Sequence, residues 1–285
     1  MKKEESSDSG QSSLVTVNVT TTNSRLDLCS QTIWSLIHQS ILPSKIVVWV
    51  SEDAYLADKG ISAIPAWCQE INLISGNLVE FKWVKNTGPY RKILPALRSA
   101  RPDDILVYAD DDTVYGRLWL SKLLSSFMSD EHKIVAARVR KLQRNTFGML
   151  KSYIYSTVIS KNSVVLDDYV ITGVGGVMLM RKHILDEYIN MDDYLKVCPT
   201  TDDLWISKLI QLSSTAVLVC PDAMLEVFEI QHSQGLTLIN NVNSSKKTRY
   251  HSLINKIKNR VAGMLGYSLC NNDKAIKSID AFFKR

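Results

Sequence analysis

Residues 104–112 read DILVYADDD, an apolar run that ends in three adjacent aspartates. The apolar and aromatic residues at 105–108 predict a buried strand. Ligands of open α/β sheets bind beyond the carboxyl ends of the strands, so Asp110, Asp111 and Asp112 stand where a functional site is expected. Adjacent carboxylates repel one another, and Mg²⁺ and Mn²⁺ are their natural partners. A metal site is therefore favoured over a solvated acidic turn, because the aspartates follow the strand directly.

Strands and helices alternate on both sides of this segment. The pattern predicts strands at 14–21, 45–51 and 81–86, and helices at 25–39, 91–101 and 118–128. Such alternation indicates an α/β fold with a mostly parallel central sheet and helices on both faces. The second half is less regular, with predicted strands at 133–142, 170–180 and 215–220 and a helix at 202–212. These strands without regular helical partners indicate a smaller, mixed β region.

The composition excludes several classes of protein. With 285 residues, 45% hydrophobic and 22% charged, the chain is typical of a folded globular protein. The Ser-rich residues 1–13 have no apolar h-region, so we expect a disordered leader rather than a secretory signal. No apolar run reaches the roughly 20 residues that span a bilayer. Five widely spaced cysteines predict free thiols, as in a cytoplasmic protein. The net charge of +5 is too modest to imply nucleic acid, and we expect no such partner.

Two further motifs carry candidate chemistry. Asp202 and Asp203, in the TTDDLW stretch at 200–205, precede a predicted helix. One carboxylate is explained by helix capping, and the other could be a general base. The TGVGGV stretch at 172–177 fits neither a phosphate-binding loop nor a dinucleotide fingerprint. Its glycines indicate either a ligand close to the backbone or close packing on a helix.

Three single residues complete the candidates. His232 could be a third metal ligand, although a lone histidine is more often a surface or core residue. Arg91 and Lys92 begin a predicted helix and could reach an anionic nucleotide. Solvated charges would explain both equally well.

Two long runs of the sequence contain basic but no acidic residues. The first lies between Glu131 and Asp167, and the second lies between Glu229 and Asp273. Solvated faces explain such runs, and so do contacts with phosphate groups or an anionic membrane surface. Residues 246–260 combine basic and apolar residues at helical spacing, so this segment would suit peripheral membrane contact. A core-packed helix would look much the same.

Three stretches in one order carry a family resemblance: residues 92–124 around the DDD motif, then ITGVGGVMLMRKHILDEY at 171–188, then CPTTDDLWISKLI at 198–210. Over about residues 14–240 the chain resembles the metal-dependent GT-A glycosyltransferases, especially the family 2-like bacterial enzymes of surface-polysaccharide assembly. The first stretch also resembles the nucleotide-sugar half of exostosin-type transferases. The resemblance implies a Rossmann-like GT-A domain at 14–285. Its parts would be a nucleotide-binding half at 14–115, an acceptor half at 116–240 and a basic C-terminal helical segment at 241–285.

The resemblance also implies roles for the first acidic motif and its surroundings. Asp110 and Asp112 would form the DxD pair that binds Mn²⁺ or Mg²⁺, with Asp112 the more direct ligand. Asp111 would lie near the nucleotide ribose. Arg91 and Lys92 lie where related enzymes touch the nucleotide.

The later motifs receive roles in the same way. Gly175 and Gly176 would line the donor-sugar or acceptor pocket. Asp203 would be the base that deprotonates the acceptor hydroxyl in inverting members, and Asp202 would support it or meet the sugar. The chain departs from the bacterial pattern at two places: it has MLMRK where LYPP is usual, and YGRLWL where YP-x-x-W-L is usual. Neither departure removes a carboxylate.

We therefore expect a metal-dependent glycosyltransferase. It would move a sugar from a nucleotide-diphosphate sugar, with UDP the expected nucleotide, to a hydroxyl of a glycan or a lipid-linked oligosaccharide. The carboxylate of Asp203 slightly favours transfer with inversion of the sugar carbon, and a retaining transferase is an alternative. Two further alternatives are a nucleotidyltransferase or phosphoesterase with two-metal chemistry, and a non-catalytic protein that binds a glycan or lipid. The expected location is the cytoplasm, with peripheral contact at the membrane.

Overall fold

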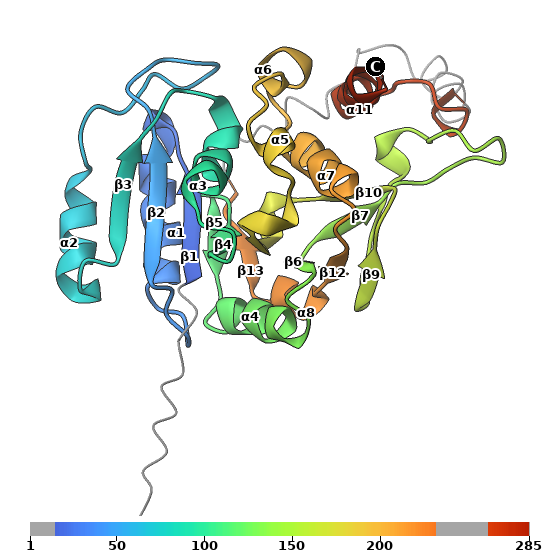
Figure 1. The fold of residues 1–285 in the computed structure, drawn as a ribbon. Helices are drawn as coiled ribbons and strands as arrows, with labels where there is room; N and C mark the ends of the chain where they lie inside the picture. The colour runs from blue at the N-terminus through green and yellow to red at the C-terminus, as the bar shows by residue number, and fades with distance from the viewer. Residues whose placement is uncertain (1–14, 232–261, 285) are drawn as a thin grey trace, which may run out of the picture.

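An eight-stranded sheet forms the centre of the computed structural model, which describes residues 15–231 and 262–284 (Figure 1). The strands, in their order across the sheet, are β3 (Val79–Trp83), β2 (Lys45–Val50), β1 (Val15–Thr20), β4 (Ile105–Tyr108), β11 (Val177–Met180), β6 (Ile134–Ala136), β12 (Val217–Val219) and β9 (Ser163–Val165). Six of these strands run in one direction, and only β11 and β9 are antiparallel to their neighbours. The expected mostly parallel sheet is confirmed.

A hydrophobic core lies on each face of the sheet because the strand residues alternate between the two faces. In β2, Ile46, Val48 and Val50 belong to one core, and Val47 and Trp49 belong to the other. The first core is covered by α1 (Leu26–Leu36), α2 (Ala66–Ser75), α4 (Trp119–Ser129) and α8 (Pro221–Met224). The second core is covered by α3 (Leu94–Ser99), α5 (Asp186–Ile189), α6 (Tyr194–Val197), α7 (Asp202–Leu212) and α11 (Asn271–Phe283). The α/β class with helices on both faces is thereby confirmed.

Two small sheets flank the central one. The strands β10 (Tyr169–Ile171), β7 (Val139–Lys141) and β8 (Thr157–Val158) form an antiparallel sheet, and β13 (Val227–Glu229) pairs with β5 (Thr113–Tyr115). Short 3-10 helices connect several elements: η1 (Asn23–Arg25), η2 (Gly88–Lys92), η3 (Tyr153–Tyr155), η4 (Gly173–Gly175) and η5 (Arg181–His183). None of the helices within 15–231 and 262–284 is long and apolar enough to cross a membrane.

Several elements differ from the sequence-based expectation. The strand predicted at 133–142 is two strands, because the chain leaves the central sheet after β6 and enters the small sheet as β7. The strand predicted at 170–180 is divided by η4 into β10 and β11. The helix predicted at 91–101 is η2 followed by α3, which has a proline in its first turn.

The helix α2 was not predicted at all. Its apolar residues lie on more than one face: Cys68 and Ile71 are buried, whereas Leu73 and Ile74 are exposed. A helix with apolar residues on its outer face lacks the single stripe on which periodicity depends.

Candidate functional site

A cluster of carboxylates from the two acidic motifs lies beyond the carboxyl end of β4. Lys92, at the end of η2, joins the motifs: its Nζ lies 2.8 Å from Asp110 Oδ1, 2.9 Å from Asp202 Oδ2 and 3.7 Å from Asp203 Oδ1. The motifs are about ninety residues apart in the sequence and are held together here by one ammonium group.

The side chain of Lys92 is nearly buried, with 6% of its surface exposed. Burial alone would lower its pKa, but the surrounding carboxylates of Asp110, Asp202 and Asp203 raise it well above its usual value. The ammonium also lies 5.6 Å from the centre of the Tyr108 ring. Lys92 therefore carries a positive charge whose partners in the structure are protein carboxylates, and a contact with the nucleotide stays a prediction.

A second cation, Arg25, holds the other two aspartates of the motif. Its Nη2 lies 2.5 Å from Asp111 Oδ1 and 2.6 Å from Asp112 Oδ2. Burial raises the pKa of Asp111 to about 6, although Arg25 acts to lower it. Arg25 was not among the predicted site residues, because it stands at the start of a helix and nothing local in the sequence links it to residues 110–112.

Asp203 lies in the first turn of α7, beside the glycine loop. The backbone N–H of Gly173 donates a 3.0 Å hydrogen bond to its Oδ1. Burial raises the pKa of Asp203 to about 7, with smaller contributions from Asp202 and Asp110, while Lys92 acts in the opposite direction. A carboxyl group that changes charge near neutral pH is suited to proton transfer.

The glycine loop and the first acidic motif are joined through Tyr115. Its hydroxyl accepts a hydrogen bond from the backbone N–H of Asp110 at 3.1 Å and donates one to the carbonyl of Val174 at 3.2 Å. A Cβ atom at Gly173 would lie 2.4 Å from Lys92 Nζ and 2.9 Å from Asp110 Oδ1. Gly173 and Tyr115 thus belong to the site, and the sequence had not singled them out as site residues.

The two glycines that were singled out pack against protein. Gly176 has φ +85°, and a Cβ there would lie 2.2 Å from the Trp119 ring. Trp119 Nε1 donates a 2.8 Å hydrogen bond to the carbonyl of Gly175, and a Cβ at Gly175 would meet Arg138 at 2.9 Å. The structure therefore favours close packing, the second of the two interpretations, for Gly175 and Gly176.

Arg91 points away from its neighbour Lys92. Its Nη2 donates to Asp58 Oδ2 at 2.9 Å and to the carbonyl of Thr21 at 3.1 Å, and its side chain is buried. Asp58 also accepts hydrogen bonds from the backbone of Asn23 and Gly60. Arg91 thus fixes the loops that follow β1 and β2, and a direct contact with a nucleotide stays a prediction.

His232 lies outside the described residues, as does the segment at 246–260. The described segment 15–231 ends next to the acidic motif, where Ile230 donates its backbone N–H to the carbonyl of Asp112 at 2.8 Å. The pairing of β13 with β5 holds residues 227–229 against this part of the chain.

The chemistry of the cluster fits a divalent cation. Five carboxylates outnumber the two cations Lys92 and Arg25 by three. Asp110, Asp112 and Asp203 remain 29%, 24% and 30% exposed at their side chains. No three His, Cys, Asp or Glu residues of the described chain form a ready-made metal cage. Mg²⁺ and Mn²⁺ sites in phosphate-handling enzymes need only one or two carboxylates, because substrate phosphates and water supply the rest.

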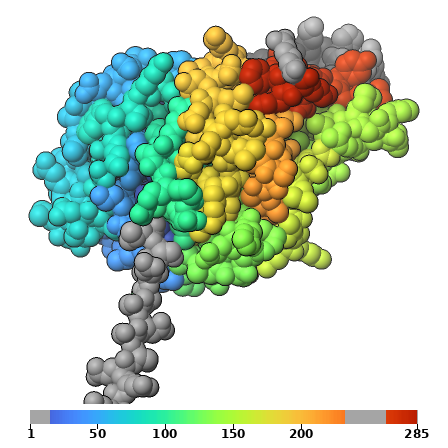
Figure 2. Space-filling view, in the orientation of Figure 1, coloured from blue at the N-terminus to red at the C-terminus, as the bar shows by residue number. Residues whose placement is uncertain are grey.

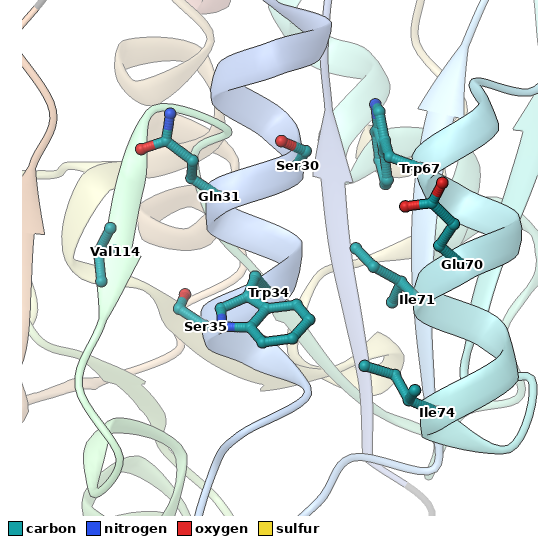
Figure 3. A pocket seen from close by; sticks show the side chains of 9 residues that line it. All are labelled: Ser30, Gln31, Trp34, Ser35, Trp67, Glu70, Ile71, Ile74 and Val114. Carbon is teal, nitrogen blue, oxygen red and sulfur yellow. The ribbon is translucent and has the colours of Figure 1, made fainter.

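One cavity lies away from these carboxylates, between α1 and α2 (Figure 3). It has a volume of about 620 Å³, and its lining residues are Ser30, Gln31, Trp34, Ser35, Trp67, Glu70, Ile71, Ile74 and Val114. A second cavity of about 430 Å³ lies between α7 and α11, on the side of β10. The acidic cluster lies in neither of these two cavities.

The model of the family described as "Glycosyltransferase like family 2" matches residues 12–260. No curated protein matches the chain significantly. Similar solved structures include S. aureus TarS 1-349, alone and in complex with UDP, each with 16% identity and a TM-score of 0.46. GalNAc-T7 with UDP, GalNAc and Mn²⁺ has 13% identity and a TM-score of 0.47.

The matched regions cover 73% of this chain for TarS and 78% for GalNAc-T7. They cover 58% of the TarS chain and 44% of the GalNAc-T7 chain, so this chain corresponds to only part of either structure.

Proposed function

Since the chain belongs to the glycosyltransferase-like family 2 and is a glycosyltransferase, we propose that it transfers a sugar from a UDP-sugar to a hydroxyl of a glycan or lipid-linked acceptor. The main support for this proposal is that Lys92 contacts carboxylates of both acidic motifs and so holds the two motifs together. One motif then serves the diphosphate, and the other serves the acceptor. The proposed location is the cytoplasm.

The DDD motif is the proposed diphosphate side. Asp110 and Asp112 would hold Mn²⁺ or Mg²⁺, which when bound neutralises charge on the departing diphosphate as a Lewis acid. Arg25 keeps Asp111 and Asp112 in place at the start of α1. Tyr115 keeps the backbone of Asp110 against the glycine loop. These contacts pre-organise the carboxylates before the donor arrives.

Asp203 is the proposed base. The Gly173 N–H fixes one of its carboxylate oxygens, and partial exposure leaves the group accessible to an acceptor hydroxyl. In a single displacement the acceptor oxygen attacks the sugar carbon on the face opposite the departing UDP, whose bond to the sugar breaks while the hydroxyl proton passes to this carboxylate, so the configuration is inverted. Lys92 and Asp202 set the charge around it and do not themselves take the proton.

The test is the identity of the products. We expect incubation with UDP-sugars, Mn²⁺ and a panel of sugar acceptors to release UDP, and chelation to stop the release. NMR of the transferred sugar should show the anomeric configuration opposite to that of the donor. A retained configuration would remove Asp203 from its role as base. Release of pyrophosphate or inorganic phosphate would instead support a nucleotidyltransferase or phosphoesterase, which clustered carboxylates also serve.

A further inference from the structure

The two acid-free runs of the sequence meet in space. The hairpin at 142–152, which follows β7, belongs to the first run, and residues 262–267 belong to the second. Ser152 donates its backbone N–H to the carbonyl of Gly263 at 2.9 Å, and Asn145 Nδ2 donates to the carbonyl of Met264 at 3.3 Å. The hairpin projects from the body of the molecule beside the residues that precede α11 (Figures 1 and 2).

Large apolar side chains are exposed where the two segments meet. Phe147 and Tyr267 are 77% and 65% exposed, and three more exposed residues accompany them. We call this set the apolar tip; its members are Phe147, Met149, Met264, Leu265 and Tyr267. Exposed apolar side chains that gather in one place mark interaction sites in many proteins.

Several backbone N–H and carbonyl groups of the hairpin are hydrogen-bonded within the hairpin itself. Asn145 Oδ1 accepts the backbone N–H groups of Phe147 and Met149 at 2.9 and 3.0 Å, and the carbonyl of Asn145 accepts that of Gly148 at 3.0 Å. Arg144 Nη1 donates to the carbonyl of Gly148 at 2.6 Å. Polar backbone groups that are already bonded internally cost little to remove from water, so the tip can enter hydrocarbon without opening its own turn.

The charges around the tip favour an anionic partner. Lys151 and Lys277 flank it, and Lys277 donates to the carbonyl of Gly266 at 2.9 Å. Of the acidic residues beside Arg144, Asp168 is held by Arg144 through two bonds of 2.6 and 2.7 Å, and Asp280 pairs with Lys208 at 2.7 Å; Asp167 is the third. Apolar side chains surrounded by lysines suit a bilayer of anionic lipids, where the chains insert and the lysines meet the headgroups.

We propose that the apolar tip is a membrane-docking surface, which inserts Phe147, Met149 and Tyr267 into the interface of an anionic bilayer. The docking does not depend on the proposed function. It uses a different segment from the one at 246–260 that the sequence suggested.

The position of the tip has a consequence for the acceptor. The hairpin continues into η3, where Asp273 of α11 accepts the Tyr153 N–H and the Ser152 hydroxyl, each at 2.6 Å. The guanidinium of Arg140 in β7 lies 5.4 Å from the centre of the Tyr153 ring, and β7 pairs with β10, which leads into the glycine loop beside Asp203. If the proposed function holds, docking would bring the enzyme to the bilayer, where a lipid-linked acceptor presents its hydroxyl.

The test is co-sedimentation of the full chain with vesicles. We expect binding to vesicles of phosphatidylglycerol and phosphatidylcholine, and weak binding to phosphatidylcholine alone. The double variant Phe147→Ser/Met149→Ser should bind about ten- to a hundredfold more weakly. Leu73→Ser, at an 85% exposed position on α2, is the matched control and should bind as the wild type does.

Thermal melting with UDP and Mn²⁺ should be the same in all three proteins, which separates docking from donor binding. Absence of wild-type binding to anionic vesicles would overturn the proposal, and so would equal binding by the double variant. A dimer in light scattering that the double variant loses would assign the tip to a second copy of the chain. Failure of docking would leave the proposed transfer reaction untouched, because UDP release is measured without vesicles.

Discussion

Asp203→Asn is expected to lower kcat/KM for sugar transfer by about 10²–10⁴-fold, the usual contribution of a general base. The amide keeps the size of the side chain and can still accept the Gly173 N–H, but it cannot take the proton of the acceptor hydroxyl. Binding of UDP with Mn²⁺ should not change, because the donor side of the site is built from residues 110–112. Initial rates of UDP release and calorimetric titration with UDP measure the two quantities separately.

A matched control is Asp186→Asn, in the first turn of α5, whose carboxylate pairs with Arg181 at an exposed position. It should leave kcat/KM unchanged. An Asp203→Asn enzyme that retains wild-type kcat/KM would contradict the assignment of the base.

The pH dependence of kcat/KM in the wild type is a second test of Asp203 as the base. Its pKa is raised from 3.8 to about 7, so the carboxyl group is protonated and inactive as a base at pH 5 to 6. We expect kcat/KM to rise with pH through about 7 and then level off, because this parameter reports the free enzyme. A profile that stays flat from pH 5 to 8 would show that no group with this pKa is needed in its ionised form.

Lys92→Met is expected to destabilise the protein by about 3–5 kcal/mol, the usual effect of removing one partner from a buried ion pair. The methionine fills a similar volume but leaves Asp110, Asp202 and Asp203 facing one another without their shared cation. Urea unfolding followed by fluorescence measures the loss. Added Mn²⁺ should restore part of it, since a divalent cation can compensate the same carboxylates.

Lys182→Met is the control, because Lys182 pairs with Asp103 on an exposed surface and its removal should cost less than about 1 kcal/mol. Equal destabilisation by the two substitutions would mean that Lys92 does not hold the motifs together.

The parts of the fold that the sequence predicted are those with a local signal. The strands β1, β2 and β4 and the helices α1, α4 and α7 have regular apolar spacing, and each was placed within a few residues. The family resemblance assigned roles in one transfer reaction to the two acidic motifs, and the structure places Lys92 between them. By contrast, no glycine, proline or asparagine marks the point between β6 and β7 at which the chain leaves one sheet for another.

The details of the site depended on contacts that the sequence does not show. Lys92 and Arg91 are adjacent, yet one side chain binds Asp110 and the other binds Asp58, because η2 turns them in different directions. In the TGVGGV stretch, the turn of η4 brings Gly173 to the carboxylates and Gly176 to Trp119. Which residue of such a pair faces the site depends on the packing of distant elements.

The most direct test of the account is calorimetric titration of UDP with and without Mn²⁺, in the wild type and in Asp112→Asn. The account predicts that Mn²⁺ tightens UDP binding by about tenfold or more in the wild type, the range of an ordinary coupling between two ligands. In Asp112→Asn the affinity for UDP should be the same with and without Mn²⁺, while the fold stays intact by circular dichroism. An Asp112→Asn protein that keeps the full Mn²⁺-dependent gain would contradict the assignment of residues 110–112 as the diphosphate side of a glycosyltransferase site.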